Sequence, residues 1–183
     1  MILIGKGEKR EIRIDPLAEK AELEIQEQAS ATLYVGANKK LRLGVALAGE
    51  RAAVKIIGRF LGVGAGAQEL VVRVIMSAPK TECDINFRAA LRDTSSSFFD
   101  GLIRVEESAK DAKGFLSYKA LLLSPGARAK PIPRLEVLTK EVASLGHAAS
   151  VGKINEDQIF YLRSRGLSLA ESENLIVQGF LRY

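Results

Sequence analysis

Short extended runs with a two-residue period fill the chain from residue 21 to residue 142. The run Ala21-Glu22-Leu23-Glu24-Ile25 shows the pattern, because polar and apolar side chains alternate along it. Such alternation predicts strands with one buried face, and turn-forming residues separate the runs about every ten residues. No segment before residue 154 shows a helical stripe that is capped at both ends. The sequence therefore predicts a mainly β protein, and the periodicity alone does not choose between a sandwich, a barrel and a β-helix.

The composition indicates an interior built mostly from aliphatic side chains. Hydrophobic residues make up 47% of the chain, aromatic residues reach only 6%, and tryptophan is absent. The net charge of +5 is not concentrated, since Lys9-Arg10 and Lys39-Lys40 are isolated basic pairs. Because a protein that follows phosphates needs a clustered basic face, we expect no nucleic-acid partner.

Cysteine usage and hydropathy indicate the compartment. Cys83 is the only cysteine, so no internal disulfide is expected. The chain does not open with a charged segment followed by an apolar one, and no apolar run approaches the roughly 20 residues of a membrane helix. We therefore expect a cytoplasmic protein with no membrane partner.

Few residues are candidates for catalysis. Cys83 lies between Glu82 and Asp84, whose carboxylates raise a thiol pKa, so we expect an inert thiol. The serines at 95–97 lack the Gly-x-Ser-x-Gly elbow of a hydrolase nucleophile. The glycine-rich run 62–66 lacks the Lys-Ser/Thr ending of a phosphate loop and predicts a turn. These residues give no support to an enzyme.

After residue 152 the pattern changes, and two short helices are expected. Asn155 can cap the first helix, with Gln158 at the matching position of a capping box. Gly166 supplies the left-handed residue that ends this helix. The second helix begins after Ser168, with Glu171 three residues further on, as in a second capping box. The apolar faces expected for the two helices are made by Ile159, Phe160 and Leu162, and by Leu169, Leu175, Ile176 and Phe180.

The link between the two helices is so short that they should form an αα-hairpin. A hairpin of this size is too small to fold alone, so it is expected to dock on the body, on a partner or on both. We therefore expect two parts, a β body at residues 1–150 and a helical hairpin at residues 151–183.

A series of ordered motifs runs through the second half of the chain. Its main members are His147, Glu156-Asp157-Gln158, Phe160-Tyr161, Arg163-Ser164-Arg165-Gly166 and Gly179-Phe180, preceded upstream by Phe99-Asp100-Gly101-Leu102-Ile103-Arg104-Val105. In this order they resemble the SufB/SufD family of iron–sulfur cluster assembly proteins. The resemblance covers roughly residues 87–180 and is most specific at its C-terminal end.

The resemblance implies a fold and a function. The fold is a right-handed parallel β-helix with a small C-terminal helical hairpin. The function is that of a non-enzymatic scaffold on which iron–sulfur clusters are built and then passed to apoproteins. SufB- and SufD-type subunits pair through their β-helices, and their C-terminal helices hold the ABC-type ATPase SufC.

Three residues favour the SufD type within this family. Tyr118 occupies the position of a cysteine in the SufB type, and a phenol does not replace a thiolate as a persulfide carrier or soft metal ligand. Gly146 and Ala148 flank the histidine where the SufB type has glutamates. We therefore expect a SufD-like subunit whose partners are a SufC-type ATPase and either a SufB-type subunit or a second copy of the chain.

The resemblance also implies site residues. His147 is the candidate metal ligand or proton-handling group, whereas the alternative is a histidine that only hydrogen-bonds the backbone between strand and helix. A complete metal site would need ligands from another subunit. No tightly bound cofactor is expected, and an iron–sulfur cluster would be held transiently with a partner subunit. The candidate ATPase-binding residues are Gln158, Phe160, Tyr161, Arg163, Arg165 and Phe180.

Two other functions remain open. The chain would be a structural homo-oligomeric β-helix protein if it had lost cluster chemistry, as the missing cysteine at position 118 favours. A polysaccharide-active β-helix enzyme would need paired carboxylates and aromatic platforms for sugars. The scarcity of aromatic residues disfavours that enzyme.

Overall fold

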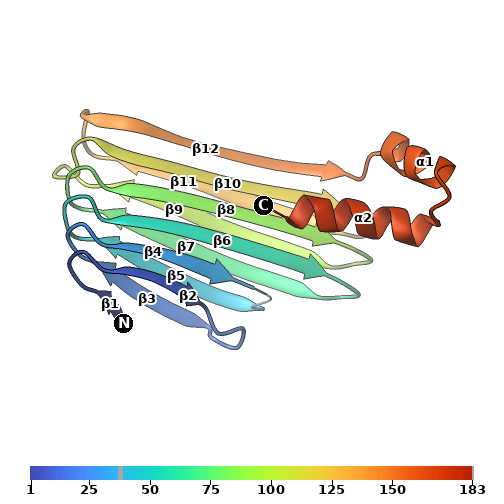
Figure 1. Cartoon of the computed structure of the whole chain (residues 1–183), viewed down its shortest axis with the longest axis horizontal. Helices are drawn as coiled ribbons and strands as arrows, with labels where there is room; N and C mark the ends of the chain where they lie inside the picture. The colour runs from blue at the N-terminus through green and yellow to red at the C-terminus, as the bar shows by residue number, and fades with distance from the viewer. Residues whose placement is uncertain (37–38, 183) are drawn as a thin grey trace.

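The chain coils into a parallel β-solenoid with a helical hairpin at its C-terminal end (Figure 1). The computed structural model describes residues 1–36 and 39–182. Odd-numbered strands form one sheet, named sheet A: β1 (Ile2–Ile4), β3 (Lys20–Ile25), β5 (Lys40–Leu47), β7 (Ala67–Met76), β9 (Ser96–Val105) and β11 (Arg128–Val137). Even-numbered strands form sheet B: β2 (Lys9–Arg13), β4 (Ser30–Val35), β6 (Ala53–Gly62), β8 (Glu82–Leu91), β10 (Ala112–Leu122) and β12 (Val142–Lys153).

The strand pairing identifies the solenoid among the predicted β folds. Each strand of the described chain pairs with the strand two places away in sequence, and every such pair is parallel. One turn of the coil therefore adds one strand to each sheet. The expected parallel β-helix with a C-terminal helical hairpin is confirmed.

The core lies between the two sheets and is mainly aliphatic, as the composition predicts. Side chains alternate inward and outward along each strand, so inward residues of successive turns stack in rows. Three of the aromatic residues of this core form one group. The ring of Phe99 lies 5.0 Å from that of Phe87 and 5.1 Å from that of Tyr118, measured between centroids.

The turns of one column share a residue with the same left-handed backbone conformation. Gly7, Gln28, Arg51, Lys80 and Asp111 all have positive φ angles, between 55° and 71°. In this column the N–H of Gln28 donates to the carbonyl of Glu50 at 2.8 Å, and that of Lys80 donates to Lys110 at 2.7 Å. Only one of the five residues is glycine, which explains why glycine spacing in the sequence marks these turns poorly.

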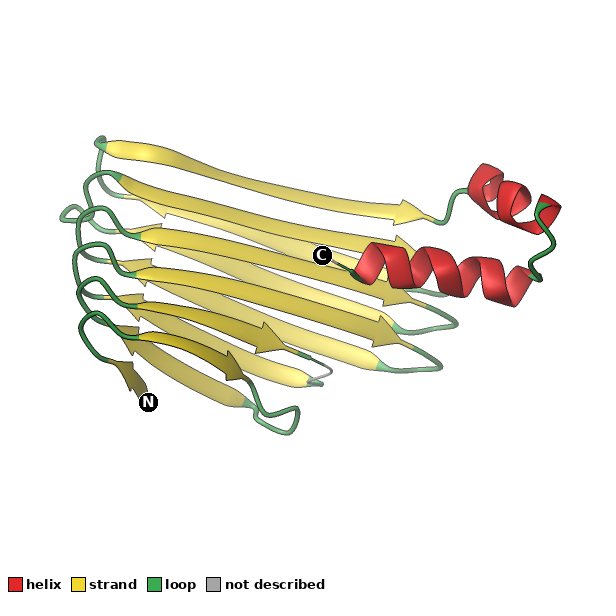
Figure 2. Cartoon of the chain, viewed as in Figure 1, coloured by secondary structure: helices red, strands yellow, loops and turns green. Residues whose placement is uncertain are grey.

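The coil widens toward its C-terminal end. Strand length grows from three residues in β1 to twelve in β12 (Figure 2). The last turn of the coil, formed by β11 and β12, is therefore among the widest. It also carries the hairpin, because α1 (Glu156–Ser164) follows β12 after a short link and leads to α2 (Leu169–Leu181).

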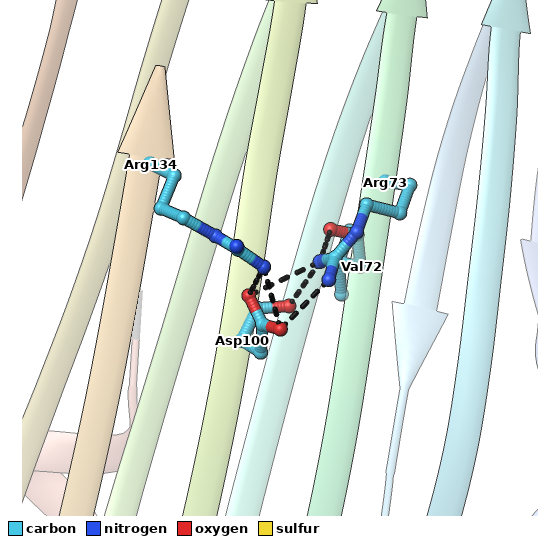
Figure 3. Close-up of polar contacts among 4 residues, drawn as sticks. All are labelled: Val72, Arg73, Asp100 and Arg134. Atoms are coloured by element: carbon cyan, nitrogen blue, oxygen red, sulfur yellow. Dashed lines mark hydrogen bonds and ion pairs between the residues drawn. The ribbon is translucent and has the colours of Figure 1, made fainter. Parts of the chain in front are cut away.

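A half-buried carboxylate on the outer surface of sheet A contacts arginines from the turns before and after its own (Figure 3). Asp100 on β9 accepts a hydrogen bond from Arg73 on β7 at 2.7 Å. It also accepts from Arg134 on β11, at 2.6 Å and 2.7 Å to its two oxygens. Only 17% of the Asp100 side chain is exposed, so these contacts are partly shielded from solvent. They connect the edge strand β11 to β9 and β7.

The helices begin and end as the sequence predicts. The Asn155 side chain accepts from the N–H groups of Asp157 and Gln158, and Ser168 and Glu171 form a full capping box. Gly166 adopts the left-handed conformation that ends α1, with φ of 94°.

The predicted apolar faces of the helices are wrong in part. Phe160 is 75% exposed, and Leu169 and Leu175 are each 49% exposed. The buried residues of α2 are Ser172 and Val177. The reason is that α2 packs against β8, and burial follows the side of the helix that meets the sheet. Size and hydropathy alone do not show which side that is.

Candidate functional site

His147 lies on the inner face of the last turn of the solenoid. It pairs in register with Leu116 of β10, whose side chain is fully buried between the sheets. Neighbouring residues in register project to the same face of a sheet, so the His147 side chain belongs to the inner face. Within the described chain no strand stacks on the far side of β12, and His147 is consequently exposed.

The surroundings of His147 form an apolar mouth at the wide end of the coil. The mouth is lined by Leu135 and Val137 of β11 and by Leu145 and Val151 of β12. These residues pair in register with buried residues of β9 and β10. Val137 is 42% exposed and Val151 is 43% exposed, although their counterparts in earlier turns are buried. The mouth is thus a section of solenoid core left open to solvent.

The described part of the chain places no group of companion ligands for a metal ion. Among residues 1–36 and 39–182, no group of three or more histidine, cysteine, aspartate and glutamate side chains is placed to hold a metal ion. The structure leaves the predicted metal role of His147 untested, and any such role would require groups from outside the described chain.

Tyr118 fills the interior next to this mouth. It is buried on β10, in register with Ala149 of β12, and its hydroxyl forms a 2.8 Å hydrogen bond with the hydroxyl of Ser97. Burial raises the pKa of the Tyr118 phenol to about 12, a change that the hydrogen bond to Ser97 only partly offsets. The side chain therefore stays neutral and structural at physiological pH.

Cys83 is an inert thiol, as predicted. Its side chain lies in the core, and burial followed by the nearby charge of Asp84 raises its pKa far above the ordinary range. Because the thiolate is the reactive form, this cysteine is unsuited to sulfur transfer or metal binding.

A second feature lies beside the mouth, where the hairpin meets sheet B. A mainly apolar cavity of about 520 Å³ lies under the hairpin. It is lined by Leu121 of β10 and, from the two helices, by Gln158, Tyr161, Leu162, Leu175, Ile176, Gly179 and Phe180. We call this cavity the hairpin groove.

The six predicted docking residues divide into three groups. Gln158, Tyr161 and Phe180 line the hairpin groove. Arg165 lies beside it, with its guanidinium 5.3 Å from the centre of the Tyr161 ring. Phe160 and Arg163 are exposed on α1 and do not line the groove.

Two arginines that sequence reasoning missed hold the hairpin in place. Arg88 on β8 donates to the carbonyl oxygens of Phe180 at 2.6 Å and Arg182 at 2.9 Å, at the C-terminal end of α2. Arg92, just after β8, forms an ion pair with Glu173 at 3.3 Å and a hydrogen bond with Asn174 at 2.9 Å. Arg88 and Arg92 lie four residues apart and on the same face of the strand pattern, and this spacing was the signal that the sequence offered. It does not show which helix the two arginines contact.

Comparison with known proteins assigns the part of the chain that carries the mouth and the hairpin groove to one family. The family described as "SUF system FeS cluster assembly, SufBD core domain" matches residues 18–180 of the chain. The chain belongs to the SufBD family. The match takes in both the mouth with His147 and most of the hairpin, so both features lie inside the SufBD core domain.

Individual SufBD relatives agree with this assignment. An iron–sulfur cluster assembly SufBD family protein of Mycobacterium bovis is 34% identical over 144 residues, which cover 67% of this chain and 36% of the relative. The iron–sulfur cluster assembly protein SufD of Bacillus subtilis is 32% identical over 121 residues, 66% of this chain and 28% of the relative. A SufBD family protein of Pyrococcus horikoshii is 45% identical over 94 residues, 51% of this chain and 20% of the relative.

The SufBD chain described here thus spans about a third of the length of the first of these relatives. No helix in the described part of the chain is both long enough and apolar enough to cross a membrane.

Proposed function

We propose that this chain is a SufD-like, non-catalytic scaffold subunit of iron–sulfur cluster assembly that binds a SufC-type ABC ATPase through its C-terminal helices. The observation that carries the proposal is the hairpin groove, an apolar cavity bounded by helices that continue directly from the strand bearing His147. The family match and the relative named SufD support the assembly role.

The chemistry of the hairpin suits an apolar anchor from a protein partner. Interfaces are centred on buried apolar and aromatic residues surrounded by polar ones, with tyrosine and arginine enriched. The groove offers Tyr161 and Phe180, and Phe160 adds a largely exposed ring on α1. Arg163 and Arg165 supply the charged rim.

The connection between groove and mouth supports a scaffold rather than a simple adaptor. The link from β12 to α1 consists of Ile154 and the cap residue Asn155, and the N–H of Ile154 still donates to Leu122 of β10. Movement of the hairpin by an ATPase would therefore be transmitted to β12. The cluster itself is the cargo, held transiently at the mouth with a second subunit, and His147 is the proposed contact on this chain.

A truncation gives the first test. The chain would be mixed with its cognate SufC-type ATPase and SufB-type subunit and the mixture sized by light scattering. We expect a complex with the full chain and none after deletion of residues 153–183. Retention of ATPase affinity by the truncated chain would refute hairpin binding.

A point variant refines this test without removing the helices. Gly179 lines the groove, and a Cβ built there meets no atom within 4 Å, so Gly179→Leu should fill the cavity while α2 stays folded. Binding of the ATPase should weaken at least tenfold, which corresponds to about 1.4 kcal/mol. Leu169→Ala, an exposed residue of the same helix that does not line the groove, is the matched control and should bind normally.

One specific observation favours a second function. Tyr118 is buried in the core at the position where the resemblance implies a cysteine in the SufB type, and a phenol does not replace a thiolate as a sulfur carrier. A structural homo-oligomer without cluster chemistry would be supported by stable self-association together with no cluster after anaerobic reconstitution, even with both partners present.

A further inference from the structure

A row of outward side chains crosses sheet A near the start of its strands. In register, Lys40 of β5 pairs with Glu69 of β7, which pairs in turn with Phe98 of β9. Lys130 of β11 completes the row beside Phe98. The chain neighbours of Phe98 on both sides are buried in the core, so the row lies on the outer face of the sheet. It presents a cation at each end, with one carboxylate and one aromatic ring between them.

Two cavities share Phe98 in their lining and form a groove along this row. The first, of about 710 Å³, is also lined by Lys40 and Glu69, and the second, of about 570 Å³, is also lined by Lys130. We call the two cavities together the sheet A groove. Small residues leave room around the ring of Phe98: Ala65, Gly66, Ala67, Ser96, Ser97, Ala127 and Ala129.

Exposed cations surround the sheet A groove without ion-pair partners. Five of them lie on or directly beside the strands that form it: Lys39, Lys40, Arg42, Arg128 and Lys130. In the described chain none of these five forms an ion pair, whereas the neighbouring Arg134 is paired with Asp100. The five look dispersed in the sequence because β5 and β11 are far apart along the chain, and the fold brings them to one surface.

We propose that the sheet A groove binds an extended acidic segment of a partner protein, with carboxylates at both ends and an apolar side chain over Phe98. This inference goes beyond the proposed function, which leaves this surface unused. Cations without partners favour a ligand rich in carboxylates, because binding breaks no existing ion pair and complementary charge also speeds association. An aromatic centre with a charged rim is the usual composition of a protein interface.

The spacing of the strands sets the spacing of the carboxylates. Lys40 and Lys130 lie on β5 and β11, which are separated by β7 and β9 (Figure 1). Neighbouring strands are about 4.8 Å apart, so the backbones that carry the two lysines are about 14 Å apart. An extended chain advances about 3.4 Å per residue, and its side chains point to the same side at every second residue. Two carboxylates four residues apart therefore reach both lysines, with an apolar residue between them facing Phe98.

A nucleic-acid strand fits this groove less well than an acidic peptide. A phosphate chain needs a continuous basic track, and stacked bases need successive aromatic platforms. Glu69 interrupts the row of cations, and Phe98 is the only ring among the described residues that line the groove. An oligonucleotide is therefore the competitor that the experiment has to exclude.

Fluorescence anisotropy with a defined peptide tests the groove. The probe is a fluorescein-labelled peptide of sequence Gly-Glu-Glu-Leu-Leu-Glu-Glu-Gly, added to the full chain. We expect saturable binding that weakens at least tenfold when glutamine replaces each glutamate and that also weakens as salt is added, since exposed charges attract the probe. Equal binding of the glutamine peptide, tighter binding of an eight-nucleotide poly(dT) strand, or no saturable binding of the probe would overturn the proposal.

Paired variants locate the site. Lys40→Ala together with Lys130→Ala should weaken binding of the probe at least tenfold. The matched control is Lys55→Ala together with Lys119→Ala, which removes two exposed lysines from sheet B and should leave binding unchanged. An equal loss in both double variants would mean general attraction to a positive protein and would overturn the groove.

A charge reversal distinguishes a lost site from a misfolded chain. Lys40→Glu together with Lys130→Glu should lose the acidic probe and bind the peptide in which lysine replaces each glutamate. Phe98→Ala should weaken the acidic probe about fivefold, because the apolar contact at the centre is lost. Loss of both peptides by a reversed chain whose strand spectrum is native by circular dichroism would overturn the proposal.

The outcomes separate this inference from the proposed function. Gly179→Leu, which fills the hairpin groove, should bind the acidic probe normally, and Lys40→Ala with Lys130→Ala should bind the SufC-type ATPase normally. Loss of the probe in Gly179→Leu would place the peptide under the hairpin and overturn the sheet A groove. A chain that binds the probe in the sheet A groove and no ATPase would support this inference and refute hairpin binding alone.

Discussion

Asp100 shows how a single residue fastens the end of the solenoid. Burial alone would raise its pKa, but the hydrogen bonds and charges of Arg73 and Arg134 outweigh burial and lower it (Figure 3). The ionised form is therefore favoured in the folded state. A carboxyl whose pKa is lower when folded adds stability above its unfolded pKa of about 4 and loses that stability as the pH falls through the folded value.

Replacing this carboxylate gives a pH-dependent prediction. Asp100→Asn should lower the free energy of unfolding by about 1–2 kcal/mol at pH 7, since charged hydrogen bonds are lost at a partly screened site. The difference from the native chain should shrink below pH 4. Urea unfolding at several pH values measures both effects. Glu22→Gln, in an exposed pair with Lys20, should leave the urea midpoint unchanged, and an equal loss in both variants would contradict the argument.

Gly58 is a second residue on which packing depends. A Cβ at this inward position would lie 1.7 Å from Cε1 of Phe87, a member of the aromatic group in the core. Gly58→Ala should therefore cost about 1–3 kcal/mol of stability through overpacking, measured by thermal or urea unfolding. The control is Gly44→Ala on the outer face. A Cβ built at Gly44 would lie 3.6 Å from Cγ of Glu22, which is an ordinary contact distance. Equal stability of the two variants would show that the core adapts.

At the scale of elements, sequence reasoning succeeded where the signal is local. Alternation identifies the strands, and Asn155, Ser168 and Gly166 identify the helix ends, because each of these acts through its own backbone neighbourhood. Stacking order is not local, and the parallel solenoid was chosen through family resemblance. The burial of Ser172 and the exposure of Phe160 were missed because they depend on which sheet face meets the helix.

The same limit applies to the candidate site. Gln158, Tyr161 and Phe180 were expected as docking residues, and the structure places them together in one groove. Arg88 and Arg92 were not expected, because an arginine on a strand does not reveal a distant helix as its partner. Long-range polar contacts of this kind can be identified only from the three-dimensional structure, whereas helix caps and alternating strands can be predicted from the local sequence.

These arginines make the docking of α2 a testable property of that element. Arg92→Ala removes the contacts with Glu173 and Asn174 and should speed amide exchange in α2 about fivefold to thirtyfold, as expected for a local loss of about 1–2 kcal/mol. Exchange in β8 should stay the same. Arg163→Ala on α1 is the control and should change neither element. Faster exchange in β8 as well would mean that Arg92 supports the sheet and not the helix.

The whole molecule is a coil whose widest turn is also its least covered. Strands lengthen toward β12, so the core section exposed at that end exceeds the section exposed at the narrow end. Both features of the candidate site, the mouth and the hairpin groove, belong to this end. A repeat protein is stabilised by contacts between neighbouring turns, so a last turn with one neighbour is held less firmly than the turns inside.

Amide exchange along the described chain should display this gradient. Amides of β6 to β9 should exchange most slowly, and amides of β12 that lack a neighbouring strand should exchange much faster, because backbone protection follows neighbouring strands. Nuclear magnetic resonance resolves these amides individually. Exchange that is as slow in β12 as in β6 to β9 would contradict the argument that neighbouring turns hold each strand.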